Sequence, residues 1–177
     1  MTGPVARVHP VSLGAHKPPA IDSARYRQVL GHFPTGVTVV TAATDDGPVG
    51  LCVGSFTSVS LDPPLVAFFA AKTSTTYPRI EAAGQYCVNI LGEDQEEEAR
   101  VFASSGTDKF AGIGWRPSPA TGAPVLDDVL AWIDCRVETV HEAGDHWLNI
   151  GRVLDLEVGR EGGPLVFFRG GFGRYTT

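Results

Sequence analysis

The sequence lacks the motifs through which side chains most often bind nucleotides or act as nucleophiles. No Gly-x-Gly-x-x-Gly run opens a predicted helix, because Gly170-Gly171-Phe172-Gly173 is followed by no helical pattern. There is no P-loop, and Gly54-Ser55-Phe56-Thr57 lacks the last glycine of a Gly-x-Ser-x-Gly elbow. If the protein is an enzyme, we therefore expect a cofactor to supply the reactivity.

Positive charge and long apolar runs are also scarce. The formal net charge is −6 and the pI is near 5.3, which argues against a general nucleic-acid surface. No segment approaches the roughly 18–20 uninterrupted apolar residues of a membrane span. Residues 1–20 lack a basic region followed by an apolar run, so we expect no secretory signal.

Cysteine is rare as well. Cys52, Cys87 and Cys135 are far apart, odd in number and set in apolar, strand-like contexts. They show no paired spacing and the five histidines do not cluster with them, so we expect no zinc or other metal site. The three residues are predicted to be buried free thiols of a cytoplasmic protein.

What is present fits one domain. With 177 residues and 43% hydrophobic content, the chain can bury a substantial core. Residues 1–20 are rich in proline and small residues and predict a flexible arm, which leaves residues 21–177 as the domain.

Strands outnumber helices and mostly follow one another directly. Helices are expected from Ser23 to about His32, near Pro78–Ala83 and over Glu93–Ala103, and a loop over Gly106–Pro124. Strands are expected over Val37–Ala43, Val49–Ser60, Leu65–Ala71, Tyr86–Leu91, Ala131–Val140, Trp147–Gly159 and Leu165–Phe168. Asp45-Asp46-Gly47-Pro48 predicts a hairpin turn. The order predicts a mainly β fold, an antiparallel β-barrel with a few peripheral α-helices.

Hydroxyl side chains alternate with apolar ones in the stretch Ser55 to Ser60, before the double proline Pro63-Pro64. Alternation with period two is typical of a strand with two unlike faces. Ser55, Thr57 and Ser58 could line a site for a polar ligand, or belong to an ordinary half-exposed strand.

Three further groups are candidates for a site. Lys72-Thr73-Ser74-Thr75-Thr76 places a cation and four hydroxyls before a short helix, which suits a phosphate or a simple helix cap. Lys109 could reach a phosphate or form a surface ion pair. Gly144-Asp145-His146 stands at a strand corner, where the imidazole could orient a ligand or simply be structural.

Taken in order, these pieces resemble the flavin reductase family with an FMN-binding split barrel, the small reductase components of two-component monooxygenases. The resemblance runs from about Ser23 to Tyr175. It is carried by Phe33-Pro34-Thr35-Gly36-Val37-Thr38-Val39-Val40-Thr41, Ser55-Phe56-Thr57-Ser58-Val59-Ser60-Leu61-Asp62-Pro63-Pro64, Tyr86-Cys87-Val88-Asn89-Ile90-Leu91, Asp108-Lys109-Phe110, Gly144-Asp145-His146 with Ile150-Gly151-Arg152-Val153, and Pro164-Leu165-Val166.

The resemblance implies roles for residues that the pattern leaves ambiguous. Thr35, Ser55, Phe56, Thr57 and Ser58 would line the flavin site, with Asn89 and Phe102 bordering it. Lys72, Thr73, Ser74 and Thr75 would cradle the flavin phosphate, with Lys109 adding charge at that end. Gly144, Asp145 and His146 would bind nicotinamide, with His146 near the hydride-transfer face as the catalytic residue.

Two positions depart from the family. Relatives often carry Thr and Ser or Asn just before Ser55-Phe56, where this chain has Cys52 and Gly54. Relatives often have tyrosine where Phe172 stands. The first departure leaves FMN versus FAD open.

The resemblance implies an NAD(P)H:flavin oxidoreductase that moves a hydride from NADH, or NADPH, to FMN or FAD and supplies a partner monooxygenase. It also implies a homodimer with neither nucleic-acid nor membrane partners. A non-catalytic flavin-binding protein or electron carrier would keep Ser55, Thr57 and Lys72 without needing His146. An oxidase of the pyridoxine-phosphate type would need more arginines than Lys72–Thr76 offers.

Overall fold

The computed structural model describes residues 20–106 and 108–175. The arm predicted over residues 1–20 therefore lies outside the described residues, apart from Ala20.

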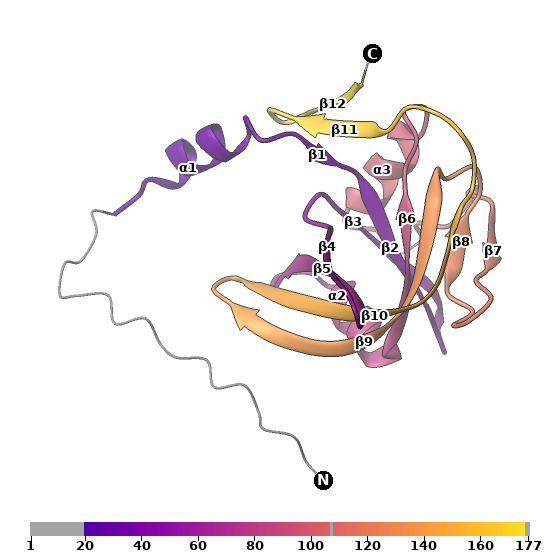
Figure 1. Ribbon diagram of the computed structural model, residues 1–177. Coiled ribbons are helices and arrows are strands. Elements are labelled where there is room, and N and C mark those ends of the chain that lie inside the picture. The colour runs from indigo at the N-terminus through magenta and orange to yellow at the C-terminus, as the bar shows by residue number, and fades with distance from the viewer. Residues whose placement is uncertain (1–19, 107, 176–177) are drawn as a thin grey trace, which may run out of the picture.

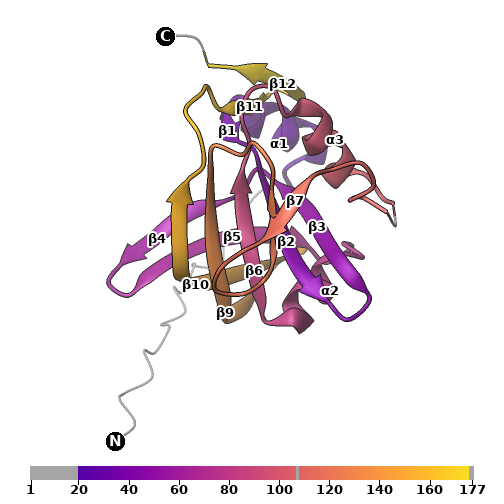
Figure 2. The ribbon, with the colours of Figure 1, turned by 90° about the vertical axis from the view of Figure 1, so that its right-hand side faces the viewer.

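Seven antiparallel strands form the main sheet, which curls into a split barrel (Figures 1 and 2). Their spatial order is β3-β2-β6-β9-β10-β5-β4. The strands are β2 (Thr38–Thr44), β3 (Gly47–Val53), β4 (Thr57–Leu61), β5 (Pro64–Ala71), β6 (Gln85–Ile90), β9 (Ala131–Ala143) and β10 (His146–Val158). The predicted antiparallel split barrel is confirmed, as are the β2–β3 hairpin and the long β9–β10 hairpin.

Two smaller antiparallel sheets flank the barrel. One consists of β1 (Thr35–Gly36), β11 (Leu165–Phe168) and β12 (Gly171–Arg174), and the other of β7 (Trp115–Pro117) and β8 (Pro124–Leu126). The sequence predicted β11 but not β1, β8 or β12, and it predicted only a loop where β7 lies. These strands are two to four residues long and rich in glycine or proline, so they carry little periodic signal.

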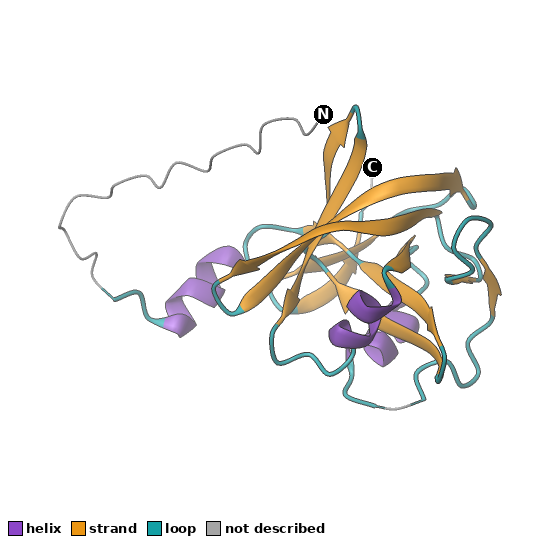
Figure 3. Cartoon of the chain, turned by 90° about the horizontal axis from the view of Figure 1, so that it is seen from below, coloured by secondary structure: helices purple, strands orange, loops and turns teal. Residues whose placement is uncertain are grey.

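Three helices are found within the described residues: α1 (Ser23–Leu30), α2 (Tyr77–Ala83) and α3 (Glu96–Ala103). The Asp22 carboxylate caps α1, accepting hydrogen bonds from the main-chain N–H groups of Ala24 and Arg25 at 3.4 and 3.1 Å. Helices α2 and α3 pack on the barrel, whereas α1 stands apart and buries none of its residues (Figure 3).

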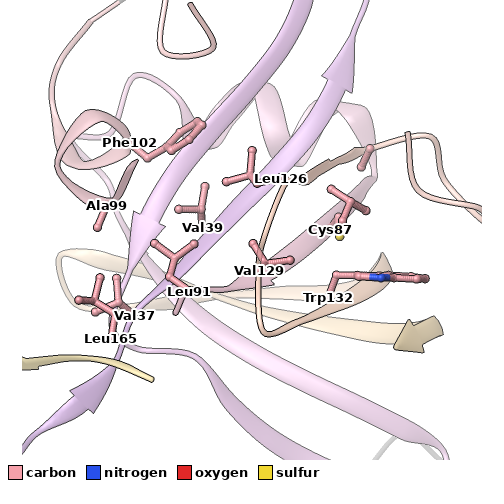
Figure 4. Close-up of a cluster of buried hydrophobic side chains, with 12 residues drawn as sticks. Val37, Val39, Cys87, Leu91, Ala99, Phe102, Leu126, Val129, Trp132 and Leu165 are labelled. Atoms are coloured by element: carbon pink, nitrogen blue, oxygen red, sulfur yellow. The ribbon is translucent and has the colours of Figure 1, made fainter. Parts of the chain in front are cut away.

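The core consists of two clusters on the two faces of the sheet strands. One joins α3 to β2, β6, β8 and β9 around Phe102, Leu91 and Trp132 (Figure 4). The other lies under α2, where Phe68 meets Tyr77 and Tyr86 edge to face. The second cluster includes side chains of β5, β6 and β10, and these strands position the candidate site.

One predicted strand is corrected by the structure. The stretch Val49–Ser60 is two strands, β3 and β4, separated by residues 54–56. The chain leaves the sheet there and crosses from one edge strand to the other, so that β3 and β4 bound the barrel's open seam.

Candidate functional site

Ser55 anchors the crossing between β3 and β4. Its Oγ accepts a hydrogen bond from the Phe69 N–H at 2.9 Å and donates to the Phe69 carbonyl at 3.1 Å. Ser55 therefore pairs with the main chain of β5 as a strand residue would, and its hydroxyl already has two partners. Its contribution to a ligand site is to fix the loop.

Gly54 leaves room for the Thr35 side chain. A Cβ atom at position 54 would lie 2.8 Å from Thr35 Oγ1, closer than real Cβ contacts. A side chain at position 54 would therefore require the Thr35 side chain to move. In this chain the Thr35 hydroxyl occupies the space in which a side chain at position 54 would begin. The glycine at position 54, where the sequence departs from the family, therefore fits its neighbour Thr35.

The remaining residues of the hydroxyl strand differ in exposure. Phe56 is partly buried against the cluster under α2, whereas Thr57 and Ser58 on β4 are exposed. Thr57 makes only a 3.2 Å bond to the Ser58 carbonyl, and the Ser58 hydroxyl has no hydrogen bond within the described part of the chain. These two hydroxyls are free to contact a ligand.

Lys72 follows β5 and is tied to the tip of the β9–β10 hairpin. Its N–H donates to the Asp145 carbonyl at 2.9 Å, and its ammonium pairs with the Glu142 carboxylate. The same Nζ lies 5.1 Å from the centroid of the Trp147 ring, within cation–π range. The hydrogen bond and charge of Lys72 lower the pKa of the Glu142 carboxyl.

His146 begins β10 directly beside this pair. It lies opposite Ala71 in the β5–β10 ladder, and its Nδ1 is 2.7 Å from the Asp145 Oδ1. That hydrogen bond lowers the pKa of the Asp145 carboxyl. Gly144 has φ +63° at the hairpin turn, a conformation that favours glycine. The imidazole is thus held by its neighbour and partly open to solvent.

The hydroxyls between Lys72 and α2 are used only in part. Ser74 Oγ accepts from the Tyr77 N–H at 3.1 Å, which fixes the start of α2. Neither the Thr73 nor the Thr75 hydroxyl has a hydrogen bond in the part of the chain that the structure describes, and both residues are exposed.

Two predicted site residues are enclosed by protein, which corrects their expected contact with the flavin. Asn89 and Phe102 have no exposed surface. The Asn89 amide donates to the Val39 and Pro124 carbonyls at 3.1 and 3.2 Å and accepts from the Leu126 N–H at 2.8 Å. Their side chains support the sheet and α3 and do not reach a ligand surface.

Lys109 is buried as well, with 8% of its surface exposed. Its ammonium donates to the carbonyls of Phe102 at 2.9 Å and Gly50 at 3.4 Å. It also lines a small hollow with Thr76 and Arg79. Burial lowers the pKa of Lys109.

The structure thus brings Ser55, Lys72 and His146 together along one stretch of β5. Phe69, which binds Ser55, and Ala71, which faces His146, are two residues apart, or roughly 7 Å along a strand. The free hydroxyls of Ser58, Thr73 and Thr75 and the buried Lys109 ammonium are donors of the kind that a flavin's ribityl and phosphate oxygens require. The residues therefore fit a flavin.

Sequence reasoning missed several residues around this site, namely Thr76, Arg79, Glu142 and Trp147. Thr76 was counted only among the hydroxyls before α2. Glu142 and Trp147 flank Gly144-Asp145-His146 in the sequence, so the hairpin pattern could have nominated them. Arg79 carried no signal of its own, because its proximity to Lys109 depends on how α2 packs.

Taken together, the split barrel and this donor-lined stretch of β5 point to a flavin-binding oxidoreductase. Residues 30–176 match the flavin reductase like domain family. The chain belongs to this family.

Individual relatives agree with this assignment. A flavin reductase of Pseudomonas putida is 50% identical over 89% of this chain and 93% of its own. HsaB of Rhodococcus jostii, the reductase subunit of a flavin-dependent monooxygenase, is 50% identical over 89% of this chain and 80% of its own. The crystal structure of nitrilotriacetate monooxygenase component B from Mycobacterium thermoresistibile superposes with a TM-score of 0.83 at 46% identity, covering 86% of each chain.

No helix within residues 20–106 and 108–175 has the length and apolar character needed to cross a membrane.

Proposed function

We propose that this protein reduces FMN or FAD with NADH and hands the reduced flavin to a separate flavin-dependent monooxygenase. The observation that carries the proposal is the placement of His146 opposite Ala71, two strand positions from the Ser55 anchor, with free hydroxyls at both ends of β5. A nicotinamide and a flavin must lie close together for hydride transfer, and this arrangement offers neighbouring contacts for both.

The protein's contribution is positioning, because the bound flavin supplies the hydride acceptor. Thr57 and Ser58 would contact the flavin from β4, and the 72–76 segment with Lys109 would hold its phosphate end. With the proton on Nδ1, His146 donates to Asp145, which leaves Nε2 to accept a hydrogen bond from the nicotinamide amide. Asp145 and Gly144 would thus orient the imidazole from the turn.

The choice of NADH and of a monooxygenase partner rests on relatives. The SmoA protein of Agrobacterium fabrum, 42% identical over 88% of this chain, is named an FMN reductase (NADH). HsaB is named the reductase subunit of a flavin-dependent monooxygenase, and the mycobacterial structure is named component B of nitrilotriacetate monooxygenase. NADPH use and the choice between FMN and FAD are decided by comparing rates with each pair.

A homodimer in the cytoplasm completes the proposal. Helix α1 exposes Tyr26, Val29 and Leu30, the exposed Ile21 lies just before it, and none of the helix residues is buried. Contiguous exposed apolar side chains of this kind mark an association surface, and a second copy is the simplest partner for one. Three free thiols favour a reducing compartment. Light scattering of the purified protein tests the dimer, and a stable, active monomer would contradict it.

The test of catalysis is nicotinamide oxidation followed by absorbance, with FMN or FAD and NADH. We expect His146→Ala to lower the rate roughly 10- to 100-fold, because the nicotinamide loses its positioning contact. His141→Ala removes an exposed histidine from the same hairpin and should leave the rate unchanged.

Thermal unfolding should be similar for both variants. An unchanged rate in His146→Ala would remove the role assigned to His146. If the wild type bound flavin yet oxidised neither NADH nor NADPH, it would be a flavin-binding protein without turnover.

A further inference from the structure

The starting point is a buried asparagine in apolar surroundings. Asn149 on β10 has no exposed surface and lies opposite Phe68, a member of the cluster under α2, in the β5–β10 ladder. Its Nδ2 donates to the Tyr77 hydroxyl at 3.3 Å, but its Oδ1 is buried without a hydrogen-bond partner among the described residues. A leucine of similar size would avoid the cost of this unpaired oxygen. The stability of the core alone therefore does not account for Asn149.

The one hydrogen bond of the Asn149 amide joins β10 to α2. Tyr77 is the first residue of α2, and its buried ring packs edge to face on Phe68 with 6.1 Å between the ring centroids. The main-chain N–H of Tyr77 donates to Ser74 Oγ at 3.1 Å. Asn149, Tyr77 and Ser74 thus form a chain of contacts that leads from β10 into the segment of residues 72–76.

The other end of this segment is tied to the same hairpin. The Lys72 N–H donates to the Asp145 carbonyl at 2.9 Å. Asp145 directly precedes His146 in the sequence, and Asn149 follows His146 along β10. The two ties therefore reach the hairpin on either side of His146, so that the segment and the imidazole are held by one strand.

Asn149 itself cannot touch a ligand beside His146. Successive side chains of a strand point to opposite faces of the sheet, so Asn149 and His146 lie on opposite faces of β10. Asn149 is buried, whereas His146 is partly exposed. Asn149 can influence the site only through the position of Tyr77 and of the segment before it.

We propose that Asn149 and Tyr77 are positioning residues, whose hydrogen bond sets the place of residues 72–76, and of the flavin that they bind, relative to His146. The proposal rests on the flavin reductase function proposed above and adds two residues that contact neither flavin nor nicotinamide. A displacement of about 1 Å between reacting groups can slow a reaction roughly 100-fold. A buried polar pair can therefore be kept for geometry although an apolar pair would be as stable.

The test replaces both partners at once. Asn149→Leu combined with Tyr77→Phe removes the hydrogen bond and both of its polar groups, so the midpoint of urea unfolding should equal or exceed that of the wild type. Single-turnover reduction of FMN by saturating NADH, followed by flavin absorbance, should be roughly tenfold slower. The Kd for FMN from fluorescence titration should stay within about threefold, because the hydroxyls of the segment are unchanged.

Hydrogen exchange of the flavin-free protein gives a readout that does not depend on turnover. The main-chain N–H groups of residues 72–77 should exchange faster in the double variant, because one of the two ties of the segment is lost. Exchange in β6 and β9 should be unchanged.

Tyr86→Phe is the matched control. Tyr86 also packs edge to face on Phe68, at 5.4 Å between centroids, but it lies on β6 and its buried hydroxyl has no hydrogen-bond partner within the described part of the chain. This variant loses the same atom from the same cluster without cutting a link to α2. It should reduce FMN, and exchange the N–H groups of residues 72–77, at wild-type rates.

A wild-type rate of FMN reduction in the double variant would overturn the positioning role. A slower rate accompanied by a lower urea midpoint, or by an equal loss in Tyr86→Phe, would overturn it as well, because the cause would then be a loosened core. These results differ from a failure of the proposed function, in which the wild type itself would reduce neither FMN nor FAD with a nicotinamide.

Discussion

The polar side chains of this protein fall into two groups. Some are buried and stabilise the barrel, and others are exposed and can contact a ligand. Asn89 bridges β6 to β2 and to the β8 strand through its amide, and it is fully buried. Ser58 and Thr73 carry equally polar groups but leave them exposed. Residue type alone cannot make this distinction, which depends on which face of a strand turns inward.

Cys52 illustrates how burial changes a residue's chemistry. It packs against the core cluster that contains Phe102, and burial raises the pKa of its thiol from 9.0 to about 11, against a smaller opposing effect of the Lys109 charge. The thiol is therefore neutral at physiological pH and serves as a core side chain.

This raised pKa predicts a loss of stability at alkaline pH. Above pH 9 the unfolded thiol ionises while the folded one keeps its proton, so the free energy of unfolding falls until about pH 11. The lowered pKa of Lys109 acts in the opposite direction, so the comparison is made with Cys52→Ala. In urea unfolding, the stability difference between wild type and Cys52→Ala should shrink steadily from pH 9 to pH 11. A constant difference over that range would show that folding does not raise the pKa of Cys52.

The elements were largely predictable from sequence, and the exceptions have physical causes. The alternating run of β2, the apolar run of β5 and the long runs of β9 and β10 were located within a few residues, because apolar residues recur along each of these strands. The break between β3 and β4 was missed because Ser55 continues the alternating pattern while its hydroxyl bonds to β5 in place of a main-chain ladder. The hydropathy pattern cannot reveal a side chain that replaces the main-chain hydrogen bonds between two strands.

Because β10 and the Tyr86 side chain of β6 approach closely, adding one methyl group at Gly151 should strongly lower the stability of the fold. A Cβ at Gly151 would lie 1.8 Å from the Tyr86 hydroxyl oxygen, which is buried and has no hydrogen-bond partner among the described residues. Gly151→Ala should destabilise the fold by about 1–3 kcal/mol in urea unfolding. Gly173→Ala, where nothing lies within 4 Å, is the control and should be nearly neutral.

The cause is checked by removing the obstructing atom. Tyr86→Phe deletes the hydroxyl and should restore part of the stability lost by Gly151→Ala, because the Tyr86 Cζ would still lie 2.7 Å from the added Cβ. If the double variant were as unstable as Gly151→Ala alone, the contact with Tyr86 would not be the source of the effect.

The β9–β10 hairpin predicts a gain of affinity from a lost ion pair. In the free protein the Glu142 carboxylate forms an ion pair with the Lys72 ammonium, beside His146. Glu142→Gln should tighten binding of NADH or FMN, measured by titration at low salt, by up to about fivefold, since exposed ion pairs are weak. The gain should vanish in a Lys72→Met background. Glu138→Gln breaks the Arg152 pair on the same hairpin and should change neither affinity.

In the molecule as a whole, the barrel has a packed core, but apolar side chains outside the core remain exposed. The described residues close a curled seven-stranded sheet with two cores, while α1 projects from it and exposes a largely apolar side (Figure 1). The second half of β10 also exposes Leu154, Leu156 and Val158. Sequence patterning predicted α1 as a helix, but its separation from the core became visible only in three dimensions.

This exposed helix predicts how the proposed dimer can be broken. Replacing Val29 and Leu30 with glutamate places two charges on the apolar side of α1 without touching the barrel core, because neither residue is buried. Burying these carboxylates against a second copy would be costly, so we expect a shift from dimer to monomer in light scattering at micromolar concentration. Gln28→Glu adds a charge on the same helix and should leave a dimer, since position 28 carries a polar side chain already. The barrel should unfold at the same urea concentration in each variant if dimerisation does not stabilise it. A double variant that remained dimeric would place the interface elsewhere, and the exposed residues of β10 would be the next surface to test.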